Sequence, residues 1–203
     1  MATVESNAPL FEVQVSTRRL TAADLAALPE MLPSGPVSYE LFAGQLIMMS
    51  PPADNHGEIQ AAISGELGIQ AVKLGFGKVW VGSGFVIRSI PDTTLFGPDV
   101  AFICTARLPV KNSKEGFIET IPDLVVEVRS KNDTKAYLAE KVKTYLAGGV
   151  GQVWVAEPES RSITIFQPGA EPQQVEPAGT ITDREFPLIP GLKLVLAEVF
   201  PKD

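Results

Sequence analysis

The stretch PDLVVEVRSKND, residues 122–133, combines the pattern of a buried strand with charges that such a strand usually lacks. Its leucine and three valines favour a strand, and the polar residues after them are typical of a turn. Asp123, Glu127 and Arg129 are separated by even numbers of residues, so the alternation of side chains along a strand places all three on one face. A core strand with such a face needs polar partners elsewhere in the chain.

Length and composition predict one ordinary globular domain. The 203 residues are enough to bury a large core, and 45% apolar with 20% charged residues is typical of globular proteins. The one cysteine, Cys104, lies in the apolar run VAFIC and has no partner for an internal disulfide, which fits a core position in a reducing cytoplasm. The sequence shows no signal-peptide pattern and no window of roughly 18 apolar residues. We therefore expect a cytoplasmic protein with no membrane partner.

The formal net charge is −7 and the isoelectric point is about 4.8. An acidic surface opposes extended, non-specific binding to nucleic acid, because phosphate contacts need clustered lysine and arginine. A local basic cleft, or a substrate bridged through a metal, is still compatible with this charge.

The periodicity of the chain divides it into an extended lead-in, residues 1–20, and one domain, residues 21–203. Thr21 and Asp24 form a variant of the capping box, and Asp133 is the expected N-cap of the last long helix. Expected helices cover 21–30, 55–74 and 133–147, and expected strands lie near 39–49, 77–90, 98–103, 122–128, 152–168 and 186–195. We found no repeat and no linker, so the pattern predicts a single α/β domain with a mixed sheet.

Asp99 and Glu127 lie near the ends of two short strands that both begin with Pro-Asp, GPDVAF and PDLVVEV. If these strands are antiparallel neighbours, the start of one lies beside the end of the other, and the two carboxylates meet at one rim. Adjacent carboxylates repel unless a proton or a hard cation lies between them, and oxygen ligands suit Mg²⁺ or Mn²⁺. The alternative is that Asp99 and Asp123 only cap turns after proline.

Lys141 falls on the inner face of the helix that follows. At about 100° per residue it lies between Tyr137 and Tyr145, whereas Glu140 and Lys143 fall outside this inward arc. An inward lysine needs a partner, because an unpaired buried charge is costly. The alternative is a lysine whose stem covers the core while its amine stays in water.

Six short segments follow one another in a specific order between about Leu20 and Phe200. They are YELFAGQLIMMSPP with a histidine after it, GPDVAFI, PDLVVEVRS, AYLAEKVKTYLAGGV, QVWVAEP and IPGLKLVLAEVF. In this order they resemble the putative restriction endonuclease family of bacteria, within the PD-(D/E)xK nuclease-like superfamily. The resemblance implies an α/β fold: a restriction-endonuclease-like core with a mixed β-sheet flanked by helices, and a C-terminal β-hairpin extension.

The resemblance also implies roles for individual residues. By matching motif, Asp99 and Glu127 are the metal-binding carboxylates, with Mg²⁺ or Mn²⁺ as cofactor, and Lys141 joins them as a catalytic residue on the helix. Glu40, in YELFAG, carries over as a further acidic site residue. The charged face of residues 122–133 then lies beside a cleft, where Glu127 holds metal and Arg129 is available to a phosphate.

Arg129 departs from the superfamily pattern, which has lysine two residues after the second carboxylate. Arginine stays protonated and binds phosphate but cannot act as a base, whereas lysine can help to orient or activate the attacking water. Catalysis would therefore depend on Lys141, and an inactive copy of the fold stays an open alternative.

His56 and Glu40 each have two interpretations. His56 matches a position where the family often carries histidine, yet it shares a helix face with Ile59 and Ile63 and would equally suit the edge of the core. Glu40 is a site residue by resemblance and an ordinary charge at a strand end by pattern.

These inferences predict a metal-dependent endonuclease that hydrolyses phosphodiester bonds, with DNA as the expected partner. Two alternatives stay open: a catalytically inactive module that binds nucleic acid or protein on the same fold, which the acidic balance and Arg129 favour, and a hydrolase of small phosphoesters. Cleavage of both DNA strands would favour a homodimer, because a symmetric dimer presents two sites.

Overall fold

The quoted stretch forms β9 (Leu124–Val128), a strand buried on both faces within a six-stranded sheet. It pairs antiparallel with β8 (Val100–Cys104) and parallel with β10 (Gln152–Glu157). The other strands are β5 (Gly77–Val81), β11 (Ser162–Phe166) and β12 (Gln173–Val175), and the order is β12-β11-β10-β9-β8-β5. The predicted mixed sheet is therefore confirmed.

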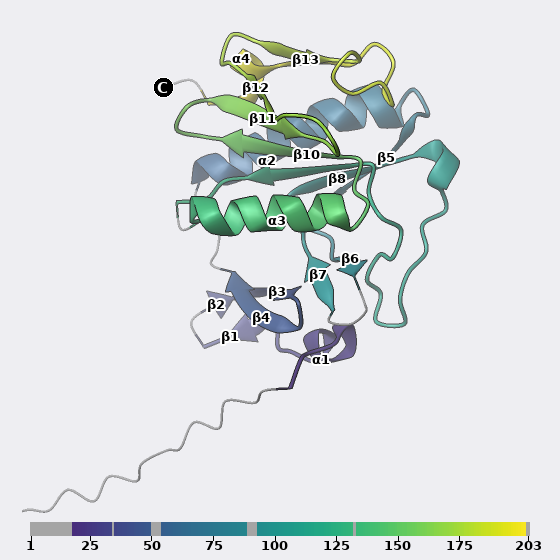
Figure 1. Ribbon diagram of the computed structural model, residues 1–203, viewed down its shortest axis with the longest axis vertical. Coiled ribbons are helices and arrows are strands. Elements are labelled where there is room, and N and C mark those ends of the chain that lie inside the picture. Colours follow the sequence, from purple (N-terminus) through teal and green to yellow (C-terminus); the bar gives the residue numbers. More distant parts are fainter. Residues whose placement is uncertain (1–17, 34, 50–53, 89–92, 132, 202–203) are drawn as a thin grey trace, which may run out of the picture.

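The computed structural model describes residues 18–33, 35–49, 54–88, 93–131 and 133–201 (Figure 1). Residues 1–17 of the expected lead-in lie outside this description, as do residues 89 and 90 of the expected strands near 77–90. No helix of the described residues combines the length and the apolar character needed to cross a membrane.

A second, four-stranded sheet lies at the end of the molecule where α1 (Ala22–Ala26) is found (Figure 1). Its strands are β4 (Gln45–Met49), β3 (Ser38–Phe42), β7 (Thr94–Phe96) and β6 (Phe85–Arg88), in that order. Ala43 and Gly44 join β3 to β4 with φ values of 49° and 73°, and two positive φ values are typical of a type I′ hairpin turn. The strands expected near 77–90 are β5 and β6, and they belong to different sheets. β5 pairs with β8 of the large sheet, whereas β6 pairs with β7 of the small sheet.

Two short antiparallel pairs complete the strands. They are β1 (Met31–Leu32) with β2 (Gly35–Pro36), and β13 (Thr180–Thr182) with β14 (Lys193–Val195). This second pair forms a C-terminal hairpin in which β14 lies in the strand expected near 186–195, whereas β13 was not predicted, and α4 (Leu196–Val199) follows β14.

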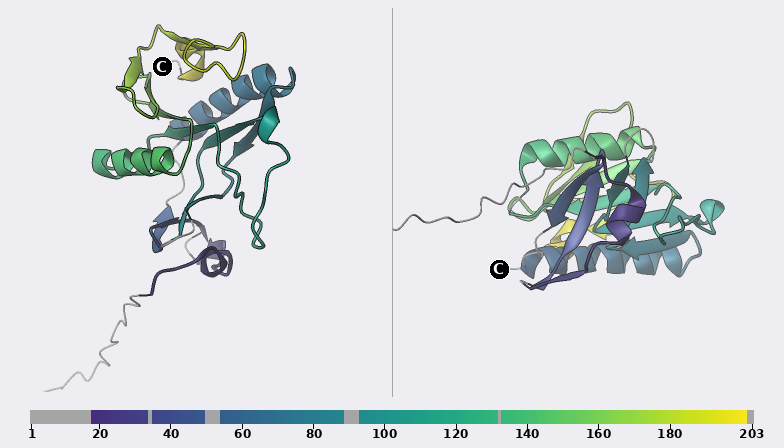
Figure 2. Two further views of the ribbon diagram at one scale, coloured as in Figure 1. Left: turned by 45° about the vertical axis from the view of Figure 1, so that its right-hand side comes forward. Right: turned by 90° about the horizontal axis from the view of Figure 1, so that it is seen from below.

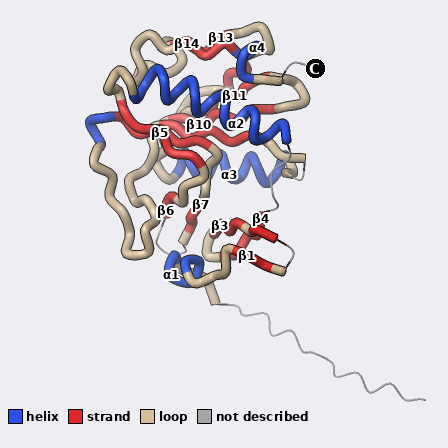
Figure 3. Tube along the Cα trace, turned by 180° about the vertical axis from the view of Figure 1, so that it is seen from behind, coloured by secondary structure: helices blue, strands red, loops and turns tan. Residues whose placement is uncertain are grey.

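The two long helices lie on opposite sides of the large sheet (Figures 2 and 3). α2 (Asp54–Leu67) continues into a π-helical turn (Gly68–Val72), and α3 (Lys135–Ala147) connects β9 to β10. Parallel neighbours need a crossover connection, and α3 is that connection here.

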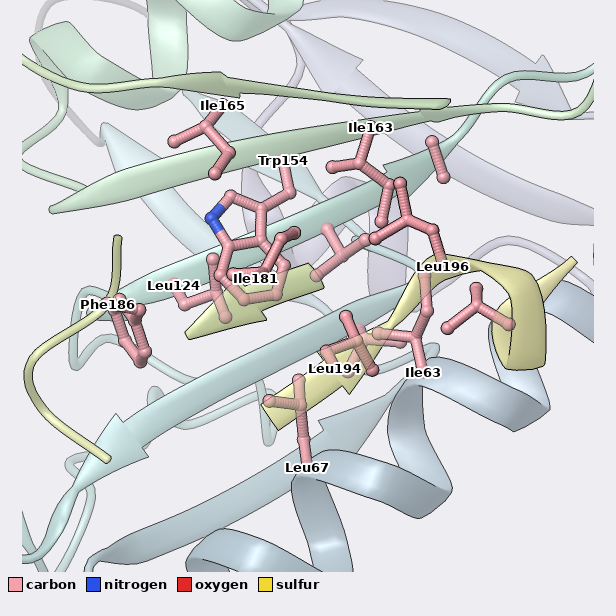
Figure 4. Packing of buried hydrophobic residues seen from close by; sticks show 14 of the residues in the cluster. Ile63, Leu67, Leu124, Trp154, Ile163, Ile165, Ile181, Phe186, Leu194 and Leu196 are labelled. Atoms are coloured by element: carbon pink, nitrogen blue, oxygen red, sulfur yellow. The ribbon is translucent and has the colours of Figure 1, made fainter. Parts of the chain in front are cut away.

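Each face of the large sheet buries its own apolar cluster. On the face covered by α2 and the C-terminal hairpin, Trp154 packs edge to face with Phe186 in a cluster that includes Ile63 of α2 (Figure 4). On the other face, Val125 packs with Tyr145 of α3 and with residues of β6 and β7. Glu127 is two residues beyond Val125, so β9 presents this carboxylate toward α3.

The N-cap predicted for α3 is wrong by one residue. Thr134, and not Asp133, has the extended N-cap backbone, and its hydroxyl accepts a hydrogen bond from the Tyr137 backbone N–H at 3.1 Å. The Asp133 carboxylate turns back instead and accepts from the Ser130 N–H at 2.8 Å. Both residues are good cap formers, and the preceding turn decides between them.

The substitution Thr134→Ala is expected to lower the free energy of unfolding by about 1 kcal/mol, because it removes the cap of the helix that carries Lys141. Urea unfolding measures this loss. Thr144→Ala, in the interior of the same helix, is the matched control. The Thr144 hydroxyl donates to the Glu140 carbonyl one turn earlier in the helix, so loss of this hydroxyl should be neutral or slightly stabilising. Equal losses for the two variants would contradict the capping role.

Candidate active site

The carboxylates of Asp99 and Glu127 come from neighbouring antiparallel strands. Val100 of β8 lies opposite Val126 of β9, so the next position in the register brings Asp99, just before β8, beside Glu127. The Val128 backbone N–H donates to Asp99 Oδ2 at 2.7 Å and holds this carboxylate against the end of β9. The antiparallel pairing that the sequence predicted for these two strands is the one observed.

Lys141 lies between two buried glutamates. Its Nζ is 3.0 Å from Glu40 Oε1 and 3.0 Å from Glu127 Oε1, and its side chain is only 4% exposed. Glu40 comes from β3 of the small sheet, Glu127 from β9 of the large sheet, and Lys141 from α3. One ammonium thus joins three elements, and the inward position predicted for Lys141 is observed.

Two tyrosine hydroxyls and one backbone N–H complete this cluster. Tyr145 donates to Glu127 Oε1 at 2.7 Å, and Tyr137 donates to Glu40 Oε2 at 3.3 Å. The Gly97 N–H donates to Glu40 Oε1 at 2.8 Å. Because burial leaves these carboxylates almost no water, protein donors must supply their hydrogen bonds.

The two tyrosines were not among the site residues predicted from the sequence. Tyr137 and Tyr145 lie four residues before and four residues after Lys141, which places all three on one side of the helix. A buried tyrosine hydroxyl usually finds a hydrogen-bond partner, and that spacing was the available signal.

The cluster carries more negative than positive charge. Burial raises the pKa of Glu127 to about 7, and the charges of Asp99 and Glu40 add to this while Lys141 opposes it. Burial lowers the pKa of Lys141, but the carboxylates of Glu127 and Glu40 outweigh burial and keep this pKa above its usual value. Lys141 is therefore an ammonium in the metal-free protein, able to donate hydrogen bonds but not to accept a proton.

His56 extends the network from the opposite side of the sheet. It lies on α2 and is 7% exposed, with Nε2 3.2 Å from Asp99 Oδ2. The hydrogen bond to Asp99 raises the pKa of His56. Its other ring nitrogen, Nδ1, is buried and has no hydrogen-bond partner among the described residues. His56 thus shares the helix face of buried Ile59 and Ile63 and also contacts a candidate metal ligand.

Arg129 lies apart from this network. Its Nη1 donates to Glu157 Oε2 at 2.6 Å, at the end of β10, and its Nε is buried without a hydrogen-bond partner among the described residues. One nitrogen of the Arg129 guanidinium is therefore already hydrogen-bonded to Glu157. Asp123, the third charge of the opening stretch, pairs with Arg107 at 2.9 Å at the other end of β9. The charged face of the strand is thus divided among three separate partners.

The donor chemistry of the site fits a divalent cation. Asp99 and Glu127 supply the carboxylate oxygens that Mg²⁺ and Mn²⁺ prefer, and two carboxylates, Glu127 and Glu40, contact the one ammonium of Lys141. Both candidate ligands also have protein partners, Val128 N–H and Lys141. Within the described residues, no group of three or more His, Cys, Asp and Glu side chains is arranged to hold a metal. Mg²⁺ is commonly bound through one or two carboxylates, with water as its other ligands.

Comparisons with known proteins agree with this fold. A family model, Uma2, described as "Putative restriction endonuclease", matches residues 23–197. Among solved structures, the chain is similar to a putative nuclease belonging to DUF820 from Anabaena variabilis ATCC 29413, at 18% sequence identity. The match covers 89% of this chain and 97% of that chain with a TM-score of 0.71, which shows a shared fold. No curated protein matches the chain.

Proposed function

The chain belongs to the Uma2 family, described as putative restriction endonucleases, and we propose that it is a metal-dependent endonuclease that hydrolyses phosphodiester bonds in DNA. The observation that carries this proposal is the buried Lys141 ammonium between Glu40 and Glu127. Burying an ammonium among carboxylates costs desolvation energy, and ionisable groups with strongly shifted pKa values concentrate at functional sites.

In this proposal, Asp99 and Glu127 would hold the divalent ion. Mg²⁺ or Mn²⁺, when bound, would polarise the phosphoryl group and lower the pKa of an attacking water. His56 orients Asp99 through its Nε2 contact, and Tyr145 orients Glu127 through its hydroxyl. These contacts fix the directions of both carboxylates before substrate arrives.

Lys141 then acts as a fixed positive charge. Since its pKa is raised, it offsets the negative charge that develops on the phosphoryl oxygens and donates a hydrogen bond to them or to the water. Glu40 holds the ammonium in place from the other side. Arg129, at the end of the same strand as Glu127, binds a phosphate of the DNA strand.

Two observations favour a second candidate function. Arg129 occupies the motif position of a lysine and is already paired with Glu157, and the chain has a net charge of −7. Both facts suit an inactive module that binds nucleic acid or protein on the same fold.

A cleavage assay separates the two functions. Purified protein is incubated with supercoiled DNA and with single-stranded DNA in Mg²⁺, in Mn²⁺ and in EDTA. We expect nicking with metal, none with EDTA, and a loss of at least about 100-fold in Asp99→Ala, which removes one metal ligand. DNA binding without any cleavage would support the module. Cleavage that continues in EDTA, or in Asp99→Ala, would contradict the proposed mechanism.

A further inference from the structure

A groove of about 530 Å³ runs between α3 and the β10–β11 hairpin. Val155, Leu138, Leu146 and Phe166 give it an apolar lining, and this volume is within the usual range of about 300–1,000 Å³ for small-molecule sites. The Phe166 side chain is half-buried and packs against the apolar cluster on this face of the sheet. The groove therefore offers an aromatic ring and aliphatic side chains to a flat apolar group.

The two sides of α3 make different contacts. One side carries Tyr137, Lys141 and Tyr145, which hold the buried carboxylates. The other side lines the groove through residues spaced three or four apart: Lys135, Leu138, Ala139, Val142, Lys143 and Leu146. The helix that positions the candidate catalytic lysine thus also forms a wall of the groove.

The rim of the groove is positively charged in an acidic protein. Lys135, Lys143 and Arg129 line it together with one carboxylate, Glu157, so three cations stand against one anion where the whole chain has a net charge of −7. The ammonium of Lys135 has no ion pair among the described residues, and Lys143 is 75% exposed with its nearest carboxylate, Glu140, at 3.6 Å. Lys135 and Lys143 are eight residues apart, about 12 Å along the helix axis, so they stand about two turns apart along this wall of the groove.

Arg129 connects the groove to the strand that carries Glu127. Arg129 lines the groove and lies two residues after Glu127 on the same strand face. A strand with its scissile phosphate at Glu127 therefore has a neighbouring nucleotide within reach of Arg129 and α3. An anionic backbone with flat bases complements the cationic rim and apolar lining.

We propose that this groove binds an unpaired nucleotide next to the scissile phosphodiester, with its base against Phe166 and its flanking phosphates at Lys135 and Lys143. The inference rests on the proposed nuclease function and adds a preference to it: the substrate is a single strand or a locally unpaired one. In a duplex the bases are stacked and paired, and a base enters such a groove only after it leaves the stack.

The test measures binding of a short fluorescein-labelled single strand, and of the same sequence as a duplex, in EDTA so that no cleavage occurs. We expect Phe166→Ala to weaken single-strand binding about 10-fold, as for the loss of one stacked base. Lys135→Ala should reduce the slope of log K against log salt by about 0.7, the value for one phosphate contact with a single strand. Lys78→Ala, an exposed lysine on β5 at the other edge of the sheet, should change neither quantity.

A second variant, which fills the groove, tests the proposal independently in case Phe166→Ala does not fold. Ala139 is exposed and lines the groove, so Ala139→Trp fills it from an exposed position and should also lower single-strand affinity about 10-fold. Ala147→Trp, exposed on the same helix but outside the groove lining, is the matched control and should bind as wild type does.

Three results would overturn the groove assignment. One is unchanged single-strand binding in Phe166→Ala and Ala139→Trp while wild type still cleaves DNA, which leaves the nuclease function intact. Another is an equal loss for single strand and duplex, which removes the base contact. A wild type that neither binds nor cleaves nucleic acid would overturn the proposed function itself, and the groove assignment with it.

Discussion

Replacement of Lys141 by methionine is expected to lower the free energy of unfolding by about 3–5 kcal/mol, the usual result of removing one partner of a buried ion pair. Methionine has a similar volume, but it leaves Glu40 and Glu127 without the ammonium that lies 3.0 Å from each. Both glutamate side chains are less than a tenth exposed, so water cannot replace the lost charge. Urea unfolding of variant and wild type measures the difference.

The difference in unfolding free energy between wild type and Lys141→Met should depend on pH. Burial raises the pKa of Glu127 to about 7 in the folded protein. A carboxyl group whose pKa is raised by folding stabilises the protein at low pH, and this contribution is lost as the pH rises through the folded value. Protonated Glu127 needs no ammonium, so the gap between Lys141→Met and wild type should be narrower at about pH 5.5 than at about pH 8.

Two variants serve as controls for Lys141→Met. Lys143→Met, on the exposed side of the same helix, should change the free energy of unfolding by less than about 0.5 kcal/mol. Adding Glu127→Gln to Lys141→Met should recover part of the loss, because one of the two unpaired carboxylates is then neutral. A Lys141→Met protein as stable as wild type at about pH 8 would show that the ion pairs do not hold the small sheet, α3 and β9 together.

Addition of Mn²⁺ is expected to raise the melting temperature of the wild type by roughly 5–11 °C at a hundredfold excess over Kd. An ion that binds only the folded state stabilises it by RT ln(1 + [L]/Kd), about 2.7 kcal/mol at that excess, and 1 kcal/mol is worth about 2–4 °C for a domain of this size. The physical source is the excess of carboxylates at Asp99, Glu127 and Glu40 over the single Lys141 ammonium. Thermal melts with and without Mn²⁺ measure the shift.

The amide variants Asp99→Asn and Glu127→Gln should abolish the Mn²⁺ shift, because each removes a charged ligand. Asp99→Asn keeps an oxygen that can accept from Val128 N–H and His56, so the metal-free variant should be at least as stable as wild type. A carboxylate with a purely structural role would behave in the opposite way, with the amide lowering stability and the metal having no effect. A wild-type melt that millimolar Mn²⁺ leaves unchanged would contradict the metal site.

Local sequence determined the strands and helices around the site. The leucine and valines of residues 124–128 predict a strand whatever surrounds them, and Thr21 with Asp24 closes the capping box that caps α1. Spacing also determined which residues share a face: Glu127 with Val125 on the strand, and Lys141 with its two tyrosines on the helix. These features follow from backbone geometry over a few residues, with periods of about 2 and 3.6.

Only the tertiary structure decided which partners these side chains meet. Glu40 lies 101 residues before Lys141 in the chain, and their contact exists because the small sheet docks beneath α3. The same docking buries the cluster, which raises the pKa of Glu127 and holds Lys141 as an ammonium. Arg129 shares a strand face with Glu127, yet it pairs with Glu157 because parallel pairing brings the end of β10 beside it. Charge interaction depends on distance and burial, and both are set by contacts between segments far apart in the sequence.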